Sequence, residues 1–301
     1  MSFLRLLTGI GACCAFAVSA QAPDPVRITG SDTVDPIVEA ATAQFTRANP
    51  NTKISVDAKG TSQGFSMLCE AKNDIAMASR PINAKELAAC KAKGVVFVEI
   101  PLAWDAVVVV ANRNDGWLRD VTIAELRQLW GVESTQRATK WSDVRSTYPA
   151  TKVTLYGLDA KSGTRDFFAT AVAGSAASMR ADYQPFADHS ALVAAVTKTP
   201  GAIGFVSLSA YLESATTVAA LAVDSGAGPV LPSAQTVVSD QYAKLSRLLF
   251  LYVNKASYDQ RAGVKEFTDF FMAGAPRFVQ YARAVPLLEK NYQEYAARLK
   301  R

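Results

Sequence analysis

Short β-type runs alternate with helix-type stretches along most of this chain, and this alternation restricts its fold more than any other feature. Strand-like runs at residues 26–29, 53–58 and 74–78 are followed by helical patterns at 34–48, 65–71 and 83–93. The rhythm continues with a helix at 122–129, a strand at 153–156, a helix after Ser162, a helix at 191–197 and a strand at 202–206. Such repetition is typical of a mostly parallel sheet flanked by helices. We therefore predict an α/β fold.

Two continuous apolar runs indicate how the chain is divided. Residues 100–112 include four consecutive valines, residues 107–110, and residues 248–254 form a second apolar run. Runs of this kind suit central strands that are buried on both faces. A chain of 301 residues is long enough for two domains. We predict that the chain crosses between lobes near residues 105 and 245, giving one lobe of 21–105 plus 245–301 and another of 106–244. A final helical block is expected over 262–300.

The N-terminus resembles an export signal. Arg5 is followed by an apolar stretch, and Val18-Ser19-Ala20 is a small-x-small site of the kind that signal peptidase cleaves. We predict a signal peptide over residues 1–20 and a periplasmic protein that begins at Gln21. An alternative is a lipobox at residues 10–13, which would lipidate Cys13 and anchor the protein.

Composition and charge exclude several function classes. Half of the residues are hydrophobic and 20% are charged, which is typical of a packed globular protein. The formal charge is +5, but no Lys/Arg block suggests nucleic-acid binding. A single histidine, His189, argues against His-based metal sites and Ser-His-Asp catalysis. Because its neighbours Asp188 and Ser190 are adjacent in sequence and point differently, we predict that His189 lies in a solvent-facing turn. We expect no metal, cofactor or catalysis.

Two cysteines remain if Cys13 and Cys14 leave with the signal. In an oxidising compartment, the pair Cys69 and Cys90 favours a disulfide. The alternative is two buried free thiols on neighbouring helices.

Three loops share one design. Residues 30–33 (Gly-Ser-Asp-Thr), 60–64 (Gly-Thr-Ser-Gln-Gly) and 161–165 (Lys-Ser-Gly-Thr-Arg) each follow a strand and open a helix. Helix starts present unpaired N–H groups and partial positive charge, glycine permits close approach, and hydroxyls add donors. In open α/β sheets, ligands bind beyond the carboxyl ends of the strands. The three loops together predict an oxyanion site, although each alone is also consistent with a simple helix cap.

Four segments, at residues 28–34, 74–81, 162–168 and 201–206, resemble signature segments of the periplasmic phosphate-binding protein of the phosphate ABC transporter. Their order and approximate spacing match, and the similarity covers nearly all of the mature chain. The resemblance implies a two-lobed type II periplasmic-binding-protein fold with a hinge between the lobes. It also implies a monomer that traps phosphate or a related oxyanion between its lobes and delivers it to an ABC permease at the inner membrane.

The resemblance further implies a set of ligand-binding residues. They are Ser31, Asp32, Thr33 and Val34 in the first loop, Thr61 and Ser62 in the second, Ser79 and Arg80 after the third strand, and Ser162, Gly163 and Thr164 in the other lobe. Arg80 is the only charged residue that we expect to touch the anion directly, the alternative being a surface salt bridge. Trp104, Asp105, Ser246 and Arg247 are expected near the hinge.

Two positions depart from the family pattern. Leu158 stands where many members have Arg, and Asp32 stands where many have Ser or Ala. A carboxylate at position 32 could accept the proton of hydrogen phosphate and so reject sulfate, could repel any anion, or could cap the helix. A receptor for molybdate or sulfate, and a signalling or scaffold module with weakened binding, therefore remain alternatives. An exported hydrolase lacks a nucleophile–base pair in the sequence.

Overall fold

The computed structural model describes residues 24–132 and 137–301. The predicted signal peptide, with Cys13 and its lipidation alternative, lies outside the described residues. Within the described part of the chain, no helix is both long enough and apolar enough to span a bilayer.

Helices and strands alternate along the chain as the sequence pattern predicts. The strands are β1 (Val26–Gly30), β2 (Ile54–Asp57), β3 (Ile75–Ala78), β4 (Phe97–Asn112), β5 (Asp120–Thr122), β6 (Thr154–Leu158), β7 (Gln184–Phe186), β8 (Ala202–Ser207), β9 (Val218–Ala220), β10 (Ala222–Asp224), β11 (Pro229–Val230), β12 (Ser246–Asn254) and β13 (Val285–Pro286). The α-helices are α1 (Asp35–Ala48), α2 (Thr61–Cys69), α3 (Ala84–Ala92), α4 (Ile123–Trp130), α5 (Trp141–Val144), α6 (Gly163–Ala173), α7 (His189–Lys198), α8 (Leu208–Ser214), α9 (Ala234–Val238), α10 (Lys255–Gln260), α11 (Ala262–Tyr281) and α12 (Glu289–Leu299).

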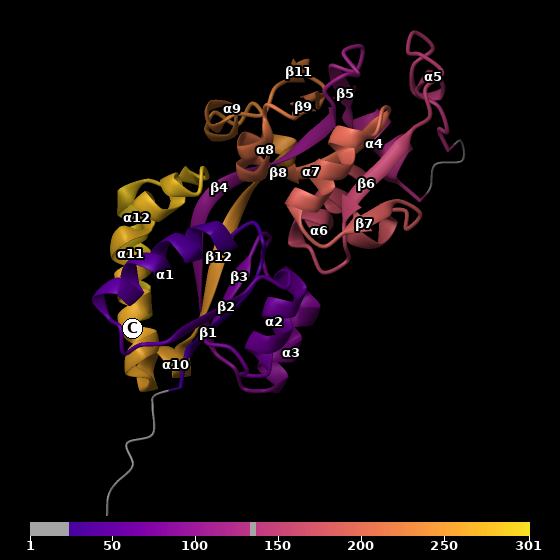
Figure 1. Cartoon of the computed structure of the whole chain (residues 1–301). Coiled ribbons are helices and arrows are strands. Elements are labelled where there is room, and N and C mark those ends of the chain that lie inside the picture. The colour runs from indigo at the N-terminus through magenta and orange to yellow at the C-terminus, as the bar shows by residue number, and fades with distance from the viewer. Residues whose placement is uncertain (1–23, 133–136) are drawn as a thin grey trace, which may run out of the picture.

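One sheet runs through both halves of the molecule. Its 10 strands include the path β2-β1-β3-β12-β4-β8-β6-β7, and β13 and β9 also pair with β4. The strands β2, β1 and β3 are parallel to one another, and so are β8, β6 and β7. The two long strands β4 and β12 lie between these groups and run antiparallel to their neighbours. Each lobe therefore has the predicted parallel strands, and the two crossing strands join the lobes (Figure 1).

Strand β4 changes partners part-way along its length. Its residues from Phe97 to Ala106 pair with β12, and those from Val107 to Ala111 pair with β8. Arg247 of β12 lies directly opposite Asp105 of β4, close to this change.

We call the part built on β1–β3, α1–α3 and α10–α12 lobe 1, and the part built on β5–β11 and α4–α9 lobe 2 (Figure 1).

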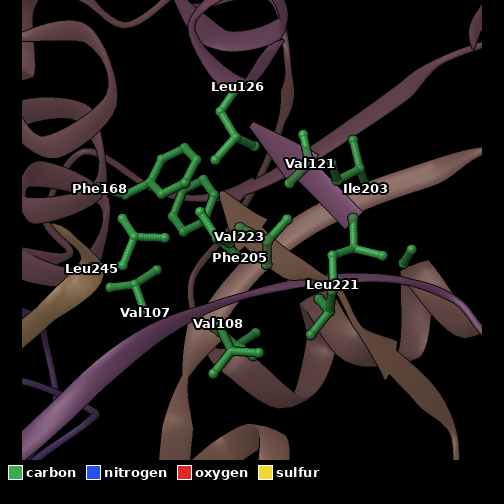
Figure 2. Packing of buried hydrophobic residues seen from close by; sticks show 14 of the residues in the cluster. Val107, Val108, Val121, Leu126, Phe168, Ile203, Phe205, Leu221, Val223 and Leu245 are labelled. Carbon is green, nitrogen blue, oxygen red and sulfur yellow. The ribbon is translucent and has the colours of Figure 1, made fainter. Parts of the chain in front are cut away.

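Each lobe has its own hydrophobic core. One buried cluster contains residues from Ala106 to Leu245 together with Val285 of β13. A second cluster includes Ala103 and Leu249. In lobe 2 the rings of Phe168 and Phe205 stack with their centroids 4.2 Å apart. Figure 2 shows these rings packed with Leu126 and Leu245. The long strand β4 contributes to both clusters, whereas β12 contributes Leu249, Leu251 and Val253 to the second one.

The final helical block differs from the prediction. Instead of one stretch over 262–300, the structure has α11 and α12, separated by the short strand β13. Residues Val285 and Pro286 of β13 pair with β4. Helix α11 ends at Tyr281, the pairing of β13 with β4 follows, and α12 then packs back against α11.

The predicted disulfide is present. Cys69, the last residue of α2, is bonded to Cys90 of α3, and both residues are buried. The bond joins two consecutive helices of lobe 1.

Candidate functional site

The first loop buries its hydroxyl groups where β1 ends and α1 begins. Ser31 and Thr33 are both buried, and the N–H of Thr33 donates to Ser31 Oγ at 3.2 Å. The N–H of Val34, which the sequence predicts as a ligand donor, donates to the carbonyl oxygen of Ser31 at 3.2 Å. The side chain of Asp32 is also mostly buried.

The start of α1 accumulates negative charge. Burial raises the pKa of Asp35 to about 6, and the charges of Glu39, Asp32 and Asp57 add to this effect. With a pKa near 6 this carboxyl is still mostly ionised at pH 7, and it becomes largely protonated only as the pH falls below about 6.

The second loop and the residue after β3 meet each other in lobe 1. The hydroxyl oxygens of Thr61 and Ser79 lie 3.2 Å apart, and the N–H of Ser79 donates to Thr61 Oγ1 at 3.1 Å. Gly163, the first residue of α6 in lobe 2, packs against both hydroxyls. A Cβ at this position would lie 2.4 Å from Thr61 Oγ1 and 2.6 Å from Ser79 Oγ. Only glycine allows lobe 2 to approach lobe 1 so closely here.

A second contact between the lobes joins two threonines. Thr33 Oγ1 of lobe 1 and Thr164 Oγ1 of lobe 2 are 3.1 Å apart, and Thr164 is fully buried. Ser162 caps the N-terminus of α6, with its Oγ accepting from the N–H of Arg165 at 3.4 Å. The structure thus brings hydroxyls from all the predicted loops together between the lobes. We call Thr33, Thr61, Ser79 and Thr164 the hydroxyl ring.

Arg80 is occupied by protein acceptors. Its Nη1 and Nη2 atoms donate to the carboxylate of Glu86, each at 2.8 Å, and Nε donates to Asp166 Oδ2 of lobe 2 at 3.1 Å. Nη1 also donates to the carbonyl oxygen of Pro81, and Nη2 to Ser62 Oγ. All five N–H donors of a guanidinium are therefore engaged.

Burial lowers the pKa of Arg80, but the hydrogen bond and charge of Glu86 and the charge of Asp166 outweigh burial and raise it above its ordinary value. The guanidinium is therefore charged and held between two carboxylates. Direct contact between Arg80 and an anion stays a prediction, which this geometry does not favour.

The prediction that His189 faces solvent is wrong. His189 is only 7% exposed, and its Nε2 atom lies 3.1 Å from Thr33 Oγ1 and 3.4 Å from Asp32 Oδ2. It starts α7, whose N-cap is Asp188, and so it reaches from lobe 2 to the first loop of lobe 1. Its side-chain contacts are with the first loop of lobe 1.

An ion pair on the crossing strands completes the site. The Nε and Nη2 atoms of Arg247 donate to Asp105 Oδ2 at 3.0 and 2.8 Å, and both residues are buried. Nη2 also donates to Thr164 Oγ1 at 2.8 Å. Oδ1 of Asp105 accepts from the N–H of Leu208 at the start of α8. The sequence places these residues near the hinge, but it does not assign them to the site.

Leu158 contributes no charge to the site. Its side chain is fully buried in the core of lobe 2, and its carbonyl oxygen accepts from the hydroxyl of Tyr183 at 2.8 Å. The guanidinium nearest to the hydroxyl of Thr164 comes instead from Arg247. A lone arginine within an apolar strand run is a sequence signal that could have indicated this, because buried charges are usually paired or bound.

Several buried polar atoms of the site have no hydrogen-bond partner among the described residues. They are Asp32 Oδ2, His189 Nδ1 and Arg247 Nη1. Hydroxyls, an imidazole and a guanidinium offer donors to a tetrahedral anion. Among the described residues, no cluster of His, Cys, Asp and Glu has the arrangement of a metal site.

Comparison with known proteins assigns the chain to a family. The family model of the PBP superfamily domain matches residues 17–274. This chain belongs to the PBP superfamily. It is 38% identical over 287 residues to protein SphX of Synechocystis sp., covering 95% of this chain and 84% of the relative.

Two further similar proteins have names that refer to phosphate binding. The chain is 27% identical to the phosphate-binding protein PstS of Staphylococcus saprophyticus, over 96% of this chain and 89% of that protein. A crystal structure of a possible phosphate binding protein from Planctomyces limnophilus superposes with a TM-score of 0.68 at 33% identity, covering 93% of this chain and 99% of that one. The predicted membership and the two-lobed fold are therefore confirmed.

Proposed function

We propose that this PBP-superfamily protein binds inorganic phosphate between its two lobes and delivers it to an ABC permease, without catalysing a reaction. The proposal goes beyond family membership, because it names the anion, the place where it binds and the recipient. It also includes export to the periplasm by the signal peptide predicted over residues 1–20.

The main support for this proposal is the contact between Thr33 and Thr164. Their hydroxyls lie 3.1 Å apart although they come from different lobes, and both are buried. An anion that accepts hydrogen bonds from both would hold the lobes together, so binding and closure would be one event. The predicted ligands Ser31, Asp32 and Val34 are sequence neighbours of Thr33, and Ser162 and Gly163 directly precede Thr164 in the chain. Thr61, Ser62 and Ser79 would complete the set from lobe 1.

Opening and closing would take place about the crossing strands. We propose lobe borders near residues 105 and 245, because the two hydrophobic cores divide between Ala103 and Ala106 and between Leu245 and Leu249. Among the described residues, β4 and β12 are the strands at which the chain passes between the lobes. A few residues at such a crossing can absorb a rotation of one lobe against the other.

Calorimetric titration tests the proposal. The protein from Gln21 onward is unfolded and refolded to remove any bound anion, and is then titrated with phosphate, sulfate and molybdate in separate experiments. We expect one-to-one phosphate binding that is micromolar or tighter and that persists in excess sulfate. Circular dichroism and a thermal unfolding transition show that the refolded protein is native before each titration.

Two other results would change the assignment. Saturation by sulfate or molybdate in preference to phosphate would keep the closing mechanism and change the cargo. Absence of binding heat with all three anions, over a range of temperatures and from folded protein, would contradict a receptor function and favour a signalling or scaffold role.

A further inference from the structure

Arg247 combines burial, charge and unused donors in a way that Arg80 does not. Arg247 is 4% exposed, and its Nη1 atom is buried without a hydrogen-bond partner among the described residues. A guanidinium has five N–H donors. In Arg247, three of them are engaged by Asp105 and Thr164, which leaves the two on Nη1. In Arg80 all five are engaged.

The orientation of the guanidinium follows from its two partners. Oδ2 of Asp105 accepts from Nε and Nη2, so the carboxylate occupies the side edge of the planar group. The other N–H of Nη2 points to Thr164 Oγ1 at 2.8 Å. The guanidinium edge formed by Nη1 and Nη2, which is the edge farthest from Nε, therefore faces Thr164. Thr164 in turn touches Thr33, so this edge is directed toward the hydroxyl ring.

We infer that Arg247 is the residue that supplies positive charge to the bound anion, with Asp105 as the positioning residue that fixes its orientation. This inference rests on the proposed function and deepens it, because it assigns the charge recognition to a crossing strand instead of to a loop. An oxyanion beside Thr164 would accept charge-assisted hydrogen bonds from Nη1, the guanidinium nitrogen that the described residues leave without an acceptor.

The position of Arg247 also connects binding with hinge motion. Arg247 and Asp105 are opposite each other on β12 and β4, the two strands that join the lobes. Oδ1 of Asp105 holds the N–H of Leu208 at the start of α8 in lobe 2. Thr164, which contacts Arg247, lies in the first turn of α6. An anion bound to both residues would therefore connect the crossing strands with the N-terminus of α6. The carboxylate of Asp105 pairs with the buried charge of Arg247. This pairing offsets the desolvation cost of the guanidinium when no anion is bound.

The test compares three variants by titration with inorganic phosphate. Arg247→Met removes the charge at similar length, Arg247→Lys keeps the charge without the fork, and Asp105→Asn retains an amide oxygen that can accept from Leu208. We expect Arg247→Met to weaken phosphate binding about 100-fold and Arg247→Lys about 10-fold. Asp105→Asn should weaken it less than Arg247→Met, since the guanidinium and its bond to Thr164 remain.

A purely structural role makes a different prediction. If Arg247 only stabilises the crossing strands, Arg247→Met and Asp105→Asn should lower the thermal unfolding temperature alike and leave the affinity of the folded protein unchanged. Chemical rescue gives a second readout with a truncated variant, Arg247→Ala. Millimolar guanidinium should partly restore phosphate binding to that variant, whereas urea, which has nearly the same shape but no charge, should not.

The outcomes separate this inference from the proposed function. If the unaltered protein binds phosphate and Arg247→Met and Arg247→Lys bind it within about 3-fold of the same affinity, less than 1 kcal/mol, the inference is overturned and the proposed function stands. If the unaltered protein binds no phosphate, both are overturned. If Arg247→Met does not fold, Arg247→Lys decides the matter, because it retains a cation at the same place.

Discussion

The Nε atom of Arg80 donates to the Oδ2 atom of Asp166 at 3.1 Å, and this bond joins the two lobes beside the hydroxyl ring. Arg80 follows β3 in lobe 1, whereas Asp166 lies in the first turn of α6 in lobe 2. Both side chains are mostly buried, at 10% and 16% exposure. Charge-assisted hydrogen bonds in such surroundings are stronger than those between neutral groups. The pair therefore favours the arrangement in which the lobes touch.

Asp166→Asn should loosen this contact between the lobes. We expect phosphate to bind about 10-fold more weakly and to dissociate faster, because a hydrogen bond to a charged group contributes about 1.5–3 kcal/mol. Titration calorimetry and stopped-flow release measure the two effects. Glu86→Gln is the matched control, since Glu86 binds the same guanidinium from within lobe 1. Equal losses in both variants would contradict a role for Asp166 in closure.

Thr164→Val should weaken phosphate binding by about 1–3 kcal/mol, because it removes a hydroxyl from a buried site and leaves its partners unsatisfied. Those partners are Thr33 and Arg247. Valine is close to threonine in shape, so the fold should be retained, and titration calorimetry measures the loss. Thr170→Val on the exposed face of the same helix is the control. An unchanged affinity in Thr164→Val would remove this hydroxyl from the site.

Gly163→Ala should interfere with closure more than with folding. The added methyl group would lie 2.4 Å from Thr61 Oγ1, but that atom belongs to the other lobe, so rotation about the crossing strands relieves the clash. Overpacking typically costs about 1–3 kcal/mol, which corresponds to a 5- to 150-fold loss of affinity. Gly116→Ala, where nothing lies within 4 Å of the new Cβ, is the control. A large fall in the unfolding temperature of the phosphate-free Gly163→Ala protein would contradict this account.

Replacing both cysteines with serine tests the disulfide separately from the site. Cys69 and Cys90 are separated by 21 residues, a loop for which cross-linking stabilises the folded state by about 3 kcal/mol. We expect a lower urea midpoint for the phosphate-free double variant and little change in phosphate affinity. The unaltered protein in strong reductant should behave like the variant. An equal midpoint with and without reductant would show that the bond adds no stability.

The local parts of this fold could be predicted from the sequence, because they depend on neighbouring residues. Hydrophobic periodicity located the main strands and helices, and glycines beside hydroxyl residues located the loops that open α1, α2 and α6. The apolar runs identified β4 and β12 as central strands. The break between α11 and α12 was missed because β13 forms only by pairing with β4, far away in the sequence.

The charged part of the site could not be predicted in the same way. Arg247 and Asp105 are 142 residues apart, and they face each other only because β12 and β4 are paired in one register. Arg80 was predicted as the anion's partner from its loop, but its acceptors Glu86 and Asp166 come from two other helices. His189 reaches the site because α7 points its first residue at Thr33. Each of these relationships is created by tertiary structure.

Asp74 offers a test of stability away from the hydroxyl ring. Its fully buried carboxylate accepts from the backbone N–H of Arg27 at 2.8 Å and from the hydroxyl of Ser257 at 2.8 Å. It also forms ion pairs with the guanidinium groups of Arg27 and Arg261. Burial raises the pKa of this carboxyl, but the hydrogen bonds from Arg27, Arg261 and Ser257 outweigh burial and lower it below the ordinary value of 3.8.

Asp74→Asn should therefore destabilise the protein by about 1.5–3 kcal/mol at neutral pH, because the hydrogen bonds that the two partly exposed arginines donate lose their charged acceptor. A carboxyl whose pKa is lower in the folded state contributes its stabilisation above its unfolded pKa and loses it as the pH falls. The difference between the two proteins should thus shrink below about pH 4, toward the lowered folded pKa. Urea unfolding of both proteins at neutral and acidic pH measures this, with Asp259→Asn on the exposed face of α10 as the control. A difference that stays constant over this pH range would mean that lost packing, not lost charge, destabilises the variant.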